Sequence, residues 1–187
     1  MRRNEYIKVY ERRPATAGIK VFIHEDALAI IEGESKKSPR TETGGVLAGR
    51  GSLEEGEIHI THASEPGPRA YRTRLNFERD TIFCQHYLDE VASRSGGLVD
   101  YVGEWHKHHE RVPRPSWRDT RTAAEIAGNP DYHVSLCLLL IIGESNRRAS
   151  LRAFVVNAFG GVSEVKWAAC DDQACIEARE LITRPAT

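Results

Sequence analysis

Two histidines and an aspartate lie close together in the segment GEWHKHHERVPRPSWRD, residues 103–119. His106 and His108 are two positions apart at the end of an expected strand, where alternate side chains project from the same face. A proline-containing loop then leads into an expected helix whose first turn contains Asp119. If this loop returns toward the strand end, all three side chains reach one point. Such a set of ligands binds zinc and leaves its fourth tetrahedral position open, as in catalytic zinc sites.

An open zinc position supports hydrolysis of a peptide bond. Zinc lowers the pKa of water to about 7 and polarises a carbonyl group as a Lewis acid, and peptide hydrolysis needs both effects. Ser116 precedes Asp119 by three residues, which is the pattern of a helix N-cap with an acidic first turn. The hydroxyl of Ser116, fixed by such a cap, is also placed to donate to an oxyanion beside the metal.

The other histidine patterns indicate a metal site less strongly. His109 directly follows His108 and remains a rival ligand, although it would point away from the shared face if the strand continues. His59 and His62 are three positions apart, so a strand places them on opposite faces. Neither HExxH nor the combined HxE and PCxxC signature occurs, which disfavours a zincin and a zinc deaminase.

An irregular alternation of strands and helices is expected around this segment. Runs rich in apolar, β-branched and aromatic residues predict strands at 19–24, 44–49, 57–63, 98–106, 132–142 and 150–157. Apolar periodicity and capping residues predict helices at 25–37, 79–95, 117–127 and 171–182. The second and third strands are separated by turn-forming residues, so they are candidates for a hairpin. We therefore expect one α/β domain over residues 1–187, with its core at about 19–157 and a mixed or antiparallel sheet.

The composition is that of an ordinary globular protein, with 40% hydrophobic and 28% charged residues. A formal charge of −1 gives no basic field of the kind that binds nucleic acid or anionic lipid, so neither partner is expected. The charged N-terminal segment has no apolar core of a signal peptide, and no apolar run approaches the roughly 20 residues of a membrane span. We expect a cytoplasmic protein. Its four cysteines form no CxxC pair and are expected to be free thiols.

Arginines are frequent on both sides of the histidine segment: Arg69, Arg72, Arg74, Arg79, Arg111, Arg114, Arg118 and Arg121. We interpret them mainly as a solvated face, in which Arg121 and Glu125 form an i,i+4 pair. The alternative is a basic rim that meets an acidic surface of a partner.

The spacing His106-x-His108, seven residues, Ser116-x-x-Asp119 resembles the HxH-x7-SxxD signature of the JAMM (JAB, MPN-plus) metallopeptidases. Glu42, in TETGGVLAGR, resembles the upstream glutamate of that family. The resemblance implies a cytidine-deaminase-like JAB/MPN fold, a mixed sheet flanked by helices, which agrees with the expected order of elements. It also implies that the two histidines and the aspartate bind zinc, and that Ser116 supports the oxyanion.

The same resemblance implies the identity of the base. Glu42 would take a proton from water and pass it to the leaving amine. Spacing alone does not select this residue, because Glu104 shares the expected face of His106 and is nearer in sequence. One position departs from the family pattern, since many members have proline after the second histidine and this chain has His109.

The GEWH opening and the prolines before Ser116 are most similar to small bacterial JAB proteins encoded beside E1- and E2-like enzymes in anti-phage operons, such as CBASS. This resemblance implies a zinc-dependent isopeptidase that cleaves after the C-terminal glycine of a ubiquitin-like modifier. E1- and E2-like enzymes of the same operon are then expected partners. A processing peptidase for a sulfur-carrier-type precursor is an alternative, as is a non-catalytic MPN scaffold that binds partners without metal.

Overall fold

The computed structural model describes residues 18–52, 56–145 and 148–171. In chain order its strands are β1 Lys20–His24, β2 Thr43–Ser52, β3 Glu57–Ala63, β4 Tyr71–Arg72, β5 Phe77–Glu78, β6 Asp100–His108, β7 Leu136–Ser145, β8 Arg148–Asn157 and β9 Val162–Cys170. Its helices are α1 Glu25–Lys37, α2 Thr81–Arg94, α3 Trp117–Gly128 and a short 3₁₀ helix, Pro130–Tyr132. Among these described residues, no helix is long and apolar enough to span a bilayer.

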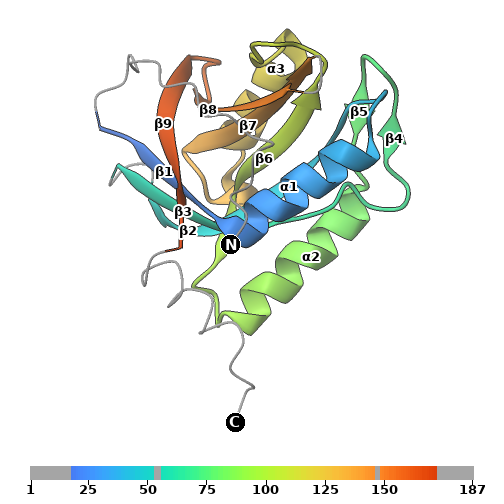
Figure 1. Ribbon diagram of the computed structural model, residues 1–187. Coiled ribbons are helices and arrows are strands. Elements are labelled where there is room, and N and C mark those ends of the chain that lie inside the picture. The colour runs from blue at the N-terminus through green and yellow to red at the C-terminus, as the bar shows by residue number, and fades with distance from the viewer. Residues whose placement is uncertain (1–17, 53–55, 146–147, 172–187) are drawn as a thin grey trace.

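Seven strands form one strongly curved mixed sheet (Figure 1). Its order is β1-β3-β2-β6-β7-β8-β9, and β9 pairs back with β1, which closes the sheet. The β1–β3, β1–β9 and β6–β7 pairs are parallel, and the other pairs are antiparallel. The α/β class and the mixed sheet expected from the sequence are therefore confirmed, and so is the antiparallel pairing of β2 with β3.

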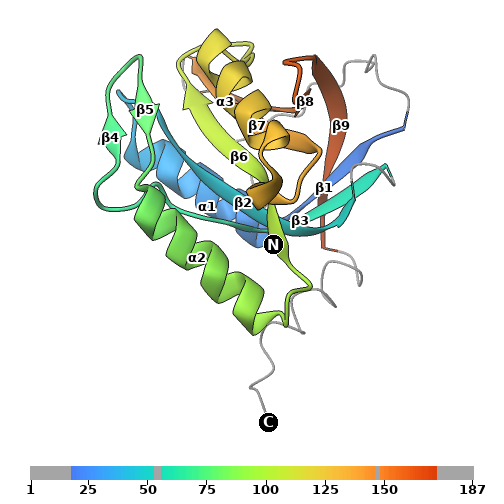
Figure 2. The same ribbon diagram turned by 180° about the vertical axis from the view of Figure 1, so that it is seen from behind.

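Helices cover both faces of the sheet, as the two opposite views show (Figures 1 and 2). Helix α1 packs on one face through Ala27, Leu28 and Ile31, which belong to the larger apolar cluster. Helices α2 and α3 lie on the other face, where Cys84 and Ile126 belong to a second cluster. The sheet is thus buried on both sides where the helices cover it, which favours strands with apolar side chains on both faces.

Strand β7 shows this pattern directly. Leu138, Leu140 and Ile142 belong to the cluster under α1, while the intervening Leu139 and Ile141 belong to the cluster under α3. Because side chains alternate along a strand, only a continuous apolar run fills both layers. This run is also why the strand was recognisable in the sequence.

Strand β6 lies between β2 and β7 and carries polar side chains on both of its faces. Trp105 packs in the cluster under α1, and the next residue on that face, Lys107, is fully buried. The Lys107 ammonium donates to the carbonyl oxygens of Ser35 and Ser38 at the end of α1, at 2.8 and 2.9 Å, and pairs with Glu144 at 2.6 Å. This buried cation ties the end of β6 to the C-terminus of α1.

Several expected boundaries were wrong for identifiable reasons. Strand β7 begins at Leu136 rather than 132, because the preceding residues form the 3₁₀ helix and His133 is left-handed, with φ 53°. Helix α2 begins after Asp80, whose carboxylate accepts from the Phe83 amide and caps the helix. Strand β6 reaches His108, two residues beyond the expected end.

Strand β9 and the β4–β5 pair were not expected at all. Strand β9 mixes polar and apolar residues without strict alternation, and β4 and β5 have two residues each. Cys84 and Cys137 are free, but Cys170 is disulfide-bonded, so the expectation of free thiols throughout was wrong. That expectation depended on the absence of a CxxC pair and of a secretion signal. The expected helix at 171–182 lies outside the described residues beyond Asp171.

We predict that Lys107→Met lowers the free energy of unfolding by about 3 kcal/mol or more, because it leaves buried acceptors and a carboxylate without their cation. Urea unfolding followed by circular dichroism measures this change. Arg94→Met is the matched control, since Arg94 forms an exposed i,i+4 pair with Glu90 and should cost under about 0.5 kcal/mol. Equal losses for the two variants would contradict the anchoring role of Lys107.

Candidate metal centre

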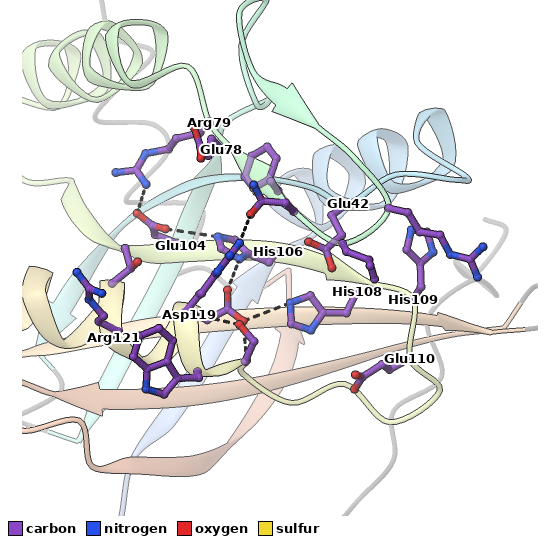
Figure 3. Close-up of a pocket in the computed structure, with 18 of the residues that line it drawn as sticks. Glu42, Glu78, Arg79, Glu104, His106, His108, His109, Glu110, Asp119 and Arg121 are labelled. Carbon is purple, nitrogen blue, oxygen red and sulfur yellow. Dashed lines mark hydrogen bonds and ion pairs between the residues drawn. The ribbon is translucent and has the colours of Figure 1, made fainter.

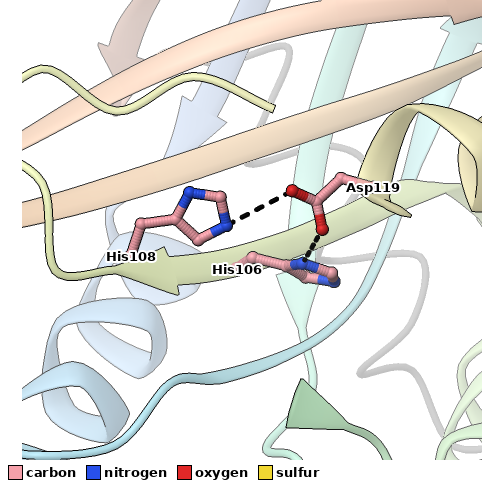
Figure 4. A group of neighbouring side chains, drawn as sticks. All are labelled: His106, His108 and Asp119. Atoms are coloured by element: carbon pink, nitrogen blue, oxygen red, sulfur yellow. Dashed lines mark hydrogen bonds and ion pairs between the residues drawn. The ribbon is translucent and has the colours of Figure 1, made fainter. Parts of the chain in front are cut away.

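The side chains of His106, His108 and Asp119 converge where β6 ends and α3 begins (Figure 4). The Asp119 carboxylate lies between the two imidazoles, with Oδ1 3.0 Å from His106 Nδ1 and Oδ2 3.3 Å from His108 Nε2. One potential ligand atom from each residue lies within 4.8 Å of the others. Small side-chain rotations bring such atoms onto one ion, and two imidazole nitrogens with one carboxylate oxygen are the donor set of catalytic zinc sites. These residues therefore fit a divalent metal.

The first turn of α3 presents Asp119 to the histidines. Ser116 is the N-cap residue: its Oγ accepts from the Asp119 amide at 3.2 Å, and Asp119 Oδ2 accepts from the Ser116 amide at 2.6 Å. This reciprocal capping box fixes both residues at the helix N-terminus. Ser116 thus has the N-cap position expected from the sequence.

The loop before α3 is held against the sheet, which explains its return to the end of β6. The carbonyl of Arg111 accepts from Ser150 Oγ at 3.0 Å, and the carbonyl of Pro113 accepts from Arg152 Nη1 at 3.0 Å. Gly143 of β7 lies under this loop, and a Cβ added there would come within 2.7 Å of Pro113 Cδ. A side chain at position 143 would therefore push the loop, and with it Asp119, away from the strand.

The two glycines of TETGG bring β2 close to the histidines. A Cβ at Gly44 would come within 2.7 Å of Phe77 Cε1 and 3.0 Å of His106 Cδ2, and a Cβ at Gly45 would come within 2.8 Å of Trp105 Nε1. Only glycine permits this approach of β2 to β6. Glu42 lies two residues before Gly44, so the glycines influence its distance from the triad of His106, His108 and Asp119.

Glu42 lines the same cavity as the triad, which has a volume of about 920 Å³. Its amide donates to the carbonyl of Thr73 at 2.7 Å, and its carboxylate points into the space beside His108 (Figure 3). Burial raises the pKa of Glu42, although the nearby imidazole of His108 opposes this shift. A raised carboxyl pKa suits a general base that works near neutral pH.

Glu104 lies on the other side of the His106 ring. Its side chain is 3% exposed, forms an ion pair with Arg79, and approaches His106 Nε2 at 3.5 Å through Oε2 (Figure 3). Both glutamates line the cavity, but the two oxygens of Glu104 face an arginine and a histidine, whereas the Glu42 carboxylate points into the space beside His108 (Figure 3). The structure therefore distinguishes the two glutamates, whereas sequence spacing gave no reason to prefer either as the base.

His109 also lines the cavity but does not join the triad (Figure 3). Among the described residues, the group whose potential ligand atoms converge comprises His106, His108 and Asp119 alone. Strand β6 ends at His108, so His109 lies beyond the strand's alternation and can line the same cavity without joining the triad. Neither His59 nor His62 belongs to the convergent group.

Most arginines near the cavity have protein partners. Arg69 pairs with Asp80 at 3.1 Å, Arg118 donates to Asn76 Oδ1 at 2.8 Å, and Arg121 pairs with Glu125 at 2.8 Å. The i,i+4 pair expected on α3 is therefore present. These contacts favour the interpretation of a paired, solvated face over a free basic rim.

The charges of the triad are strongly coupled. Burial lowers the pKa of His106, but hydrogen bonds with Asp119 and Glu104 outweigh this effect and raise the pKa to about 9. Burial raises the pKa of Asp119, but hydrogen bonds with the two histidines hold it far below its usual range. At neutral pH the protein without metal therefore holds an imidazolium beside a carboxylate, and a metal cation must displace that proton.

Comparison with known proteins relates residues 24–156 to the family described as prokaryotic homologs of the JAB domain. The chain is 40% identical over 84 residues to the CD-NTase/cGAS isopeptidase of Escherichia coli, a match that covers 44% of this chain and 51% of that relative. A protein of the same name from Enterobacter hormaechei is 31% identical over 123 residues, which cover 66% of this chain and 67% of that protein. The matched segment thus spans about half the length of the first relative and two thirds of the second.

Two further proteins match more of the chain. A probable metalloprotease of Sinorhizobium fredii is 26% identical over 160 residues, which cover 78% of this chain and 97% of that protein. A solution structure of a Desulfitobacterium hafniense protein superposes with a TM-score of 0.58 at 16% identity, over 81% of this chain and 94% of the other. The structural match shows a shared fold.

We predict that His106→Ala, His108→Ala and Asp119→Asn each weaken zinc binding by on the order of 100-fold or more, since the loss of a ligand should exceed the 10–100-fold typical of its supporting partners. Mass spectrometry of bound metal and competition with a chelator measure this loss. His109→Ala is the matched control and should retain about one zinc per chain. An equal loss in this control would mean that the ligand set is wrongly assigned.

A second prediction concerns pH. Because the proton on His106 must leave before its ring binds a metal, zinc affinity should rise about tenfold per pH unit from neutrality up to the pKa of about 9, and level off above it. Titrations against a chelator, corrected for the chelator's own protonation, give this dependence. An affinity that does not change between neutral pH and pH 9 would contradict a protonated His106 in the metal-free protein.

Proposed function

The chain belongs to the prokaryotic homologs of the JAB domain, and from this premise we propose that it is a zinc-dependent isopeptidase that cleaves after the C-terminal glycine of a bacterial ubiquitin-like modifier. The observation that carries the proposal is the convergence of His106, His108 and Asp119 in a cavity that Glu42 also lines. A scaffold without catalysis needs no such convergence of ligands with a partly buried carboxylate. The metalloprotease and isopeptidase names of the relatives support a peptidase.

Each residue of the site has a separate task in the proposed reaction. Zinc, when bound by the triad, supplies Lewis acidity toward the scissile carbonyl and toward water. Glu42 accepts a proton from the attacking water and then donates it to the leaving amine, a transfer that its raised pKa favours. Ser116 Oγ accepts from the Asp119 amide, so its own hydroxyl hydrogen is available to donate to the oxyanion.

The cavity suits an extended polypeptide tail. It lies between the segment that contains β5 and the first turns of α3, with Leu75 and Phe77 on one side and Trp117 and Arg121 on the other. Leu75 and Trp117 are 83% and 73% exposed, so both offer apolar surface to an incoming chain. Among the described residues, β5 pairs with β4 alone, which leaves its other edge open to pairing with a substrate strand. The flexible C-terminus of a ubiquitin-like protein fits these requirements.

The names of two relatives support a biological setting for this activity. Two of them carry the name CD-NTase/cGAS isopeptidase. We place this chain in the same kind of pathway, an anti-phage system in which E1- and E2-like enzymes attach the modifier and this enzyme removes it. The leaving group in that setting is the lysine ε-amine of the conjugated target, which Glu42 must protonate.

We predict that Glu42→Gln lowers kcat by about 10³-fold or more, toward the upper end of general acid–base contributions, while zinc content stays at the wild-type value. The substrates are a lysine-linked conjugate of a bacterial ubiquitin-like protein and a linear fusion of the same protein. Mass spectrometry should locate the cut after the terminal glycine in both, with the conjugate cleaved at least as fast. The isosteric control is Glu90→Gln on the exposed face of α2, which should keep wild-type turnover.

The outcomes separate the alternatives. Cleavage of the linear fusion alone would favour a processing peptidase, and no cleavage of either substrate by a zinc-loaded protein would favour a scaffold. A fully active Glu42→Gln variant would reject Glu42 as the base. Activity that survives thorough removal of zinc would reject the metallopeptidase mechanism itself.

A further inference from the structure

The His106 ring is held by four neighbours. Nδ1 faces Asp119 Oδ1 at 3.0 Å, and Nε2 faces Glu104 Oε2 at 3.5 Å. Phe77 packs edge-on against the ring, with centroids 5.5 Å apart and an interplanar angle of 79°. Gly44 closes the remaining side, because even a Cβ there would crowd the ring. A ring held in this way presents one defined nitrogen, Nδ1, to Asp119.

The Glu104 side chain is also fixed in position by its contacts. Its side chain is 3% exposed, and its second oxygen forms an ion pair with Arg79, whose side chain is 18% exposed. Arg79 lies between β5 and α2, and Glu104 lies on β6, so the ion pair joins two segments that are distant in sequence. Glu104 lines the cavity, but each of its carboxylate oxygens already faces a partner, one the Arg79 guanidinium and the other the His106 ring.

We infer that Glu104, supported by Arg79, is a positioning residue that accepts the Nε2–H of His106 and thereby makes Nδ1 the nitrogen that binds the metal. This inference rests on the proposed zinc site. Ligand histidines are commonly oriented by a carboxylate on the other ring nitrogen, which selects the tautomer and strengthens metal binding. His108 presents Nε2 to Asp119, so the two ligand histidines would use different ring nitrogens.

Two measurements test the inference without substrate. Zinc affinity, measured by chelator competition, should fall about 10–100-fold in Glu104→Ala, and the conservative Glu104→Gln should recover part of the loss because its amide oxygen still accepts the Nε2–H. In ¹⁵N-histidine NMR spectra of the zinc-loaded wild type, the His106 signals, assigned by their absence in His106→Gln, should show a proton on Nε2 and none on Nδ1. Glu90→Ala on α2 is the matched control and should bind zinc as the wild type does.

A double-mutant cycle separates positioning from a general loss of structure. Arg79→Met should weaken zinc binding in the wild type but add no further loss in Glu104→Ala, because Arg79 acts through the missing carboxylate. Additive losses, a wild-type zinc affinity in Glu104→Ala, or a proton on Nδ1 would each overturn the inference. A wild-type protein that binds no zinc would overturn both this inference and the proposed function. A protein that binds zinc with these properties but cleaves no conjugate would overturn the proposed function alone.

Discussion

The carboxylate of Asp119 makes two sets of contacts from a single side-chain position. It accepts from the Ser116 amide to close the first turn of α3, and it lies between the imidazoles of His106 and His108. The helix can therefore begin only where Asp119, the third residue of its first turn, also reaches the two histidines. The loop before the helix, held by Ser150 and Arg152, is fixed to meet this condition.

Strand β6 provides the other half of the site because its two faces differ in chemistry. One face is anchored by the buried Lys107, whose ammonium satisfies carbonyl groups at the end of α1 and pairs with Glu144. The opposite face carries His106 and His108 toward the cavity. Gly44 allows the neighbouring strand β2 to lie close to His106. Glu42, which directly precedes β2, is thereby brought beside the triad. A rigid, doubly paired strand is a suitable support for ligands that must keep their geometry.

Sequence patterns could predict those features that depend on local chemistry. The shared face of the two histidines follows from strand alternation, and the cap at Ser116 follows from the N-cap pattern. Strand β9 could not be recognised, because its polar residues do not alternate with apolar ones and its pairing with β1 joins distant parts of the chain. The Arg79–Glu104 ion pair could not be predicted either, because the two residues are distant in sequence and no local pattern links them. The choice between Glu42 and Glu104 likewise required the family resemblance. Both line the cavity, and the structure adds that Glu104 is ion-paired with Arg79 whereas the Glu42 carboxylate points into the space beside His108.

The most direct measurement is a crystal structure of the zinc-loaded protein with anomalous diffraction data collected at the zinc edge. The account predicts one anomalous peak at about 2.0–2.2 Å from a nitrogen of His106, a nitrogen of His108 and an oxygen of Asp119. Glu42 should face the ion from beyond ligand distance. A peak bound by Glu42 or His109 in place of one of these residues, or no peak between β6 and α3, would contradict the account.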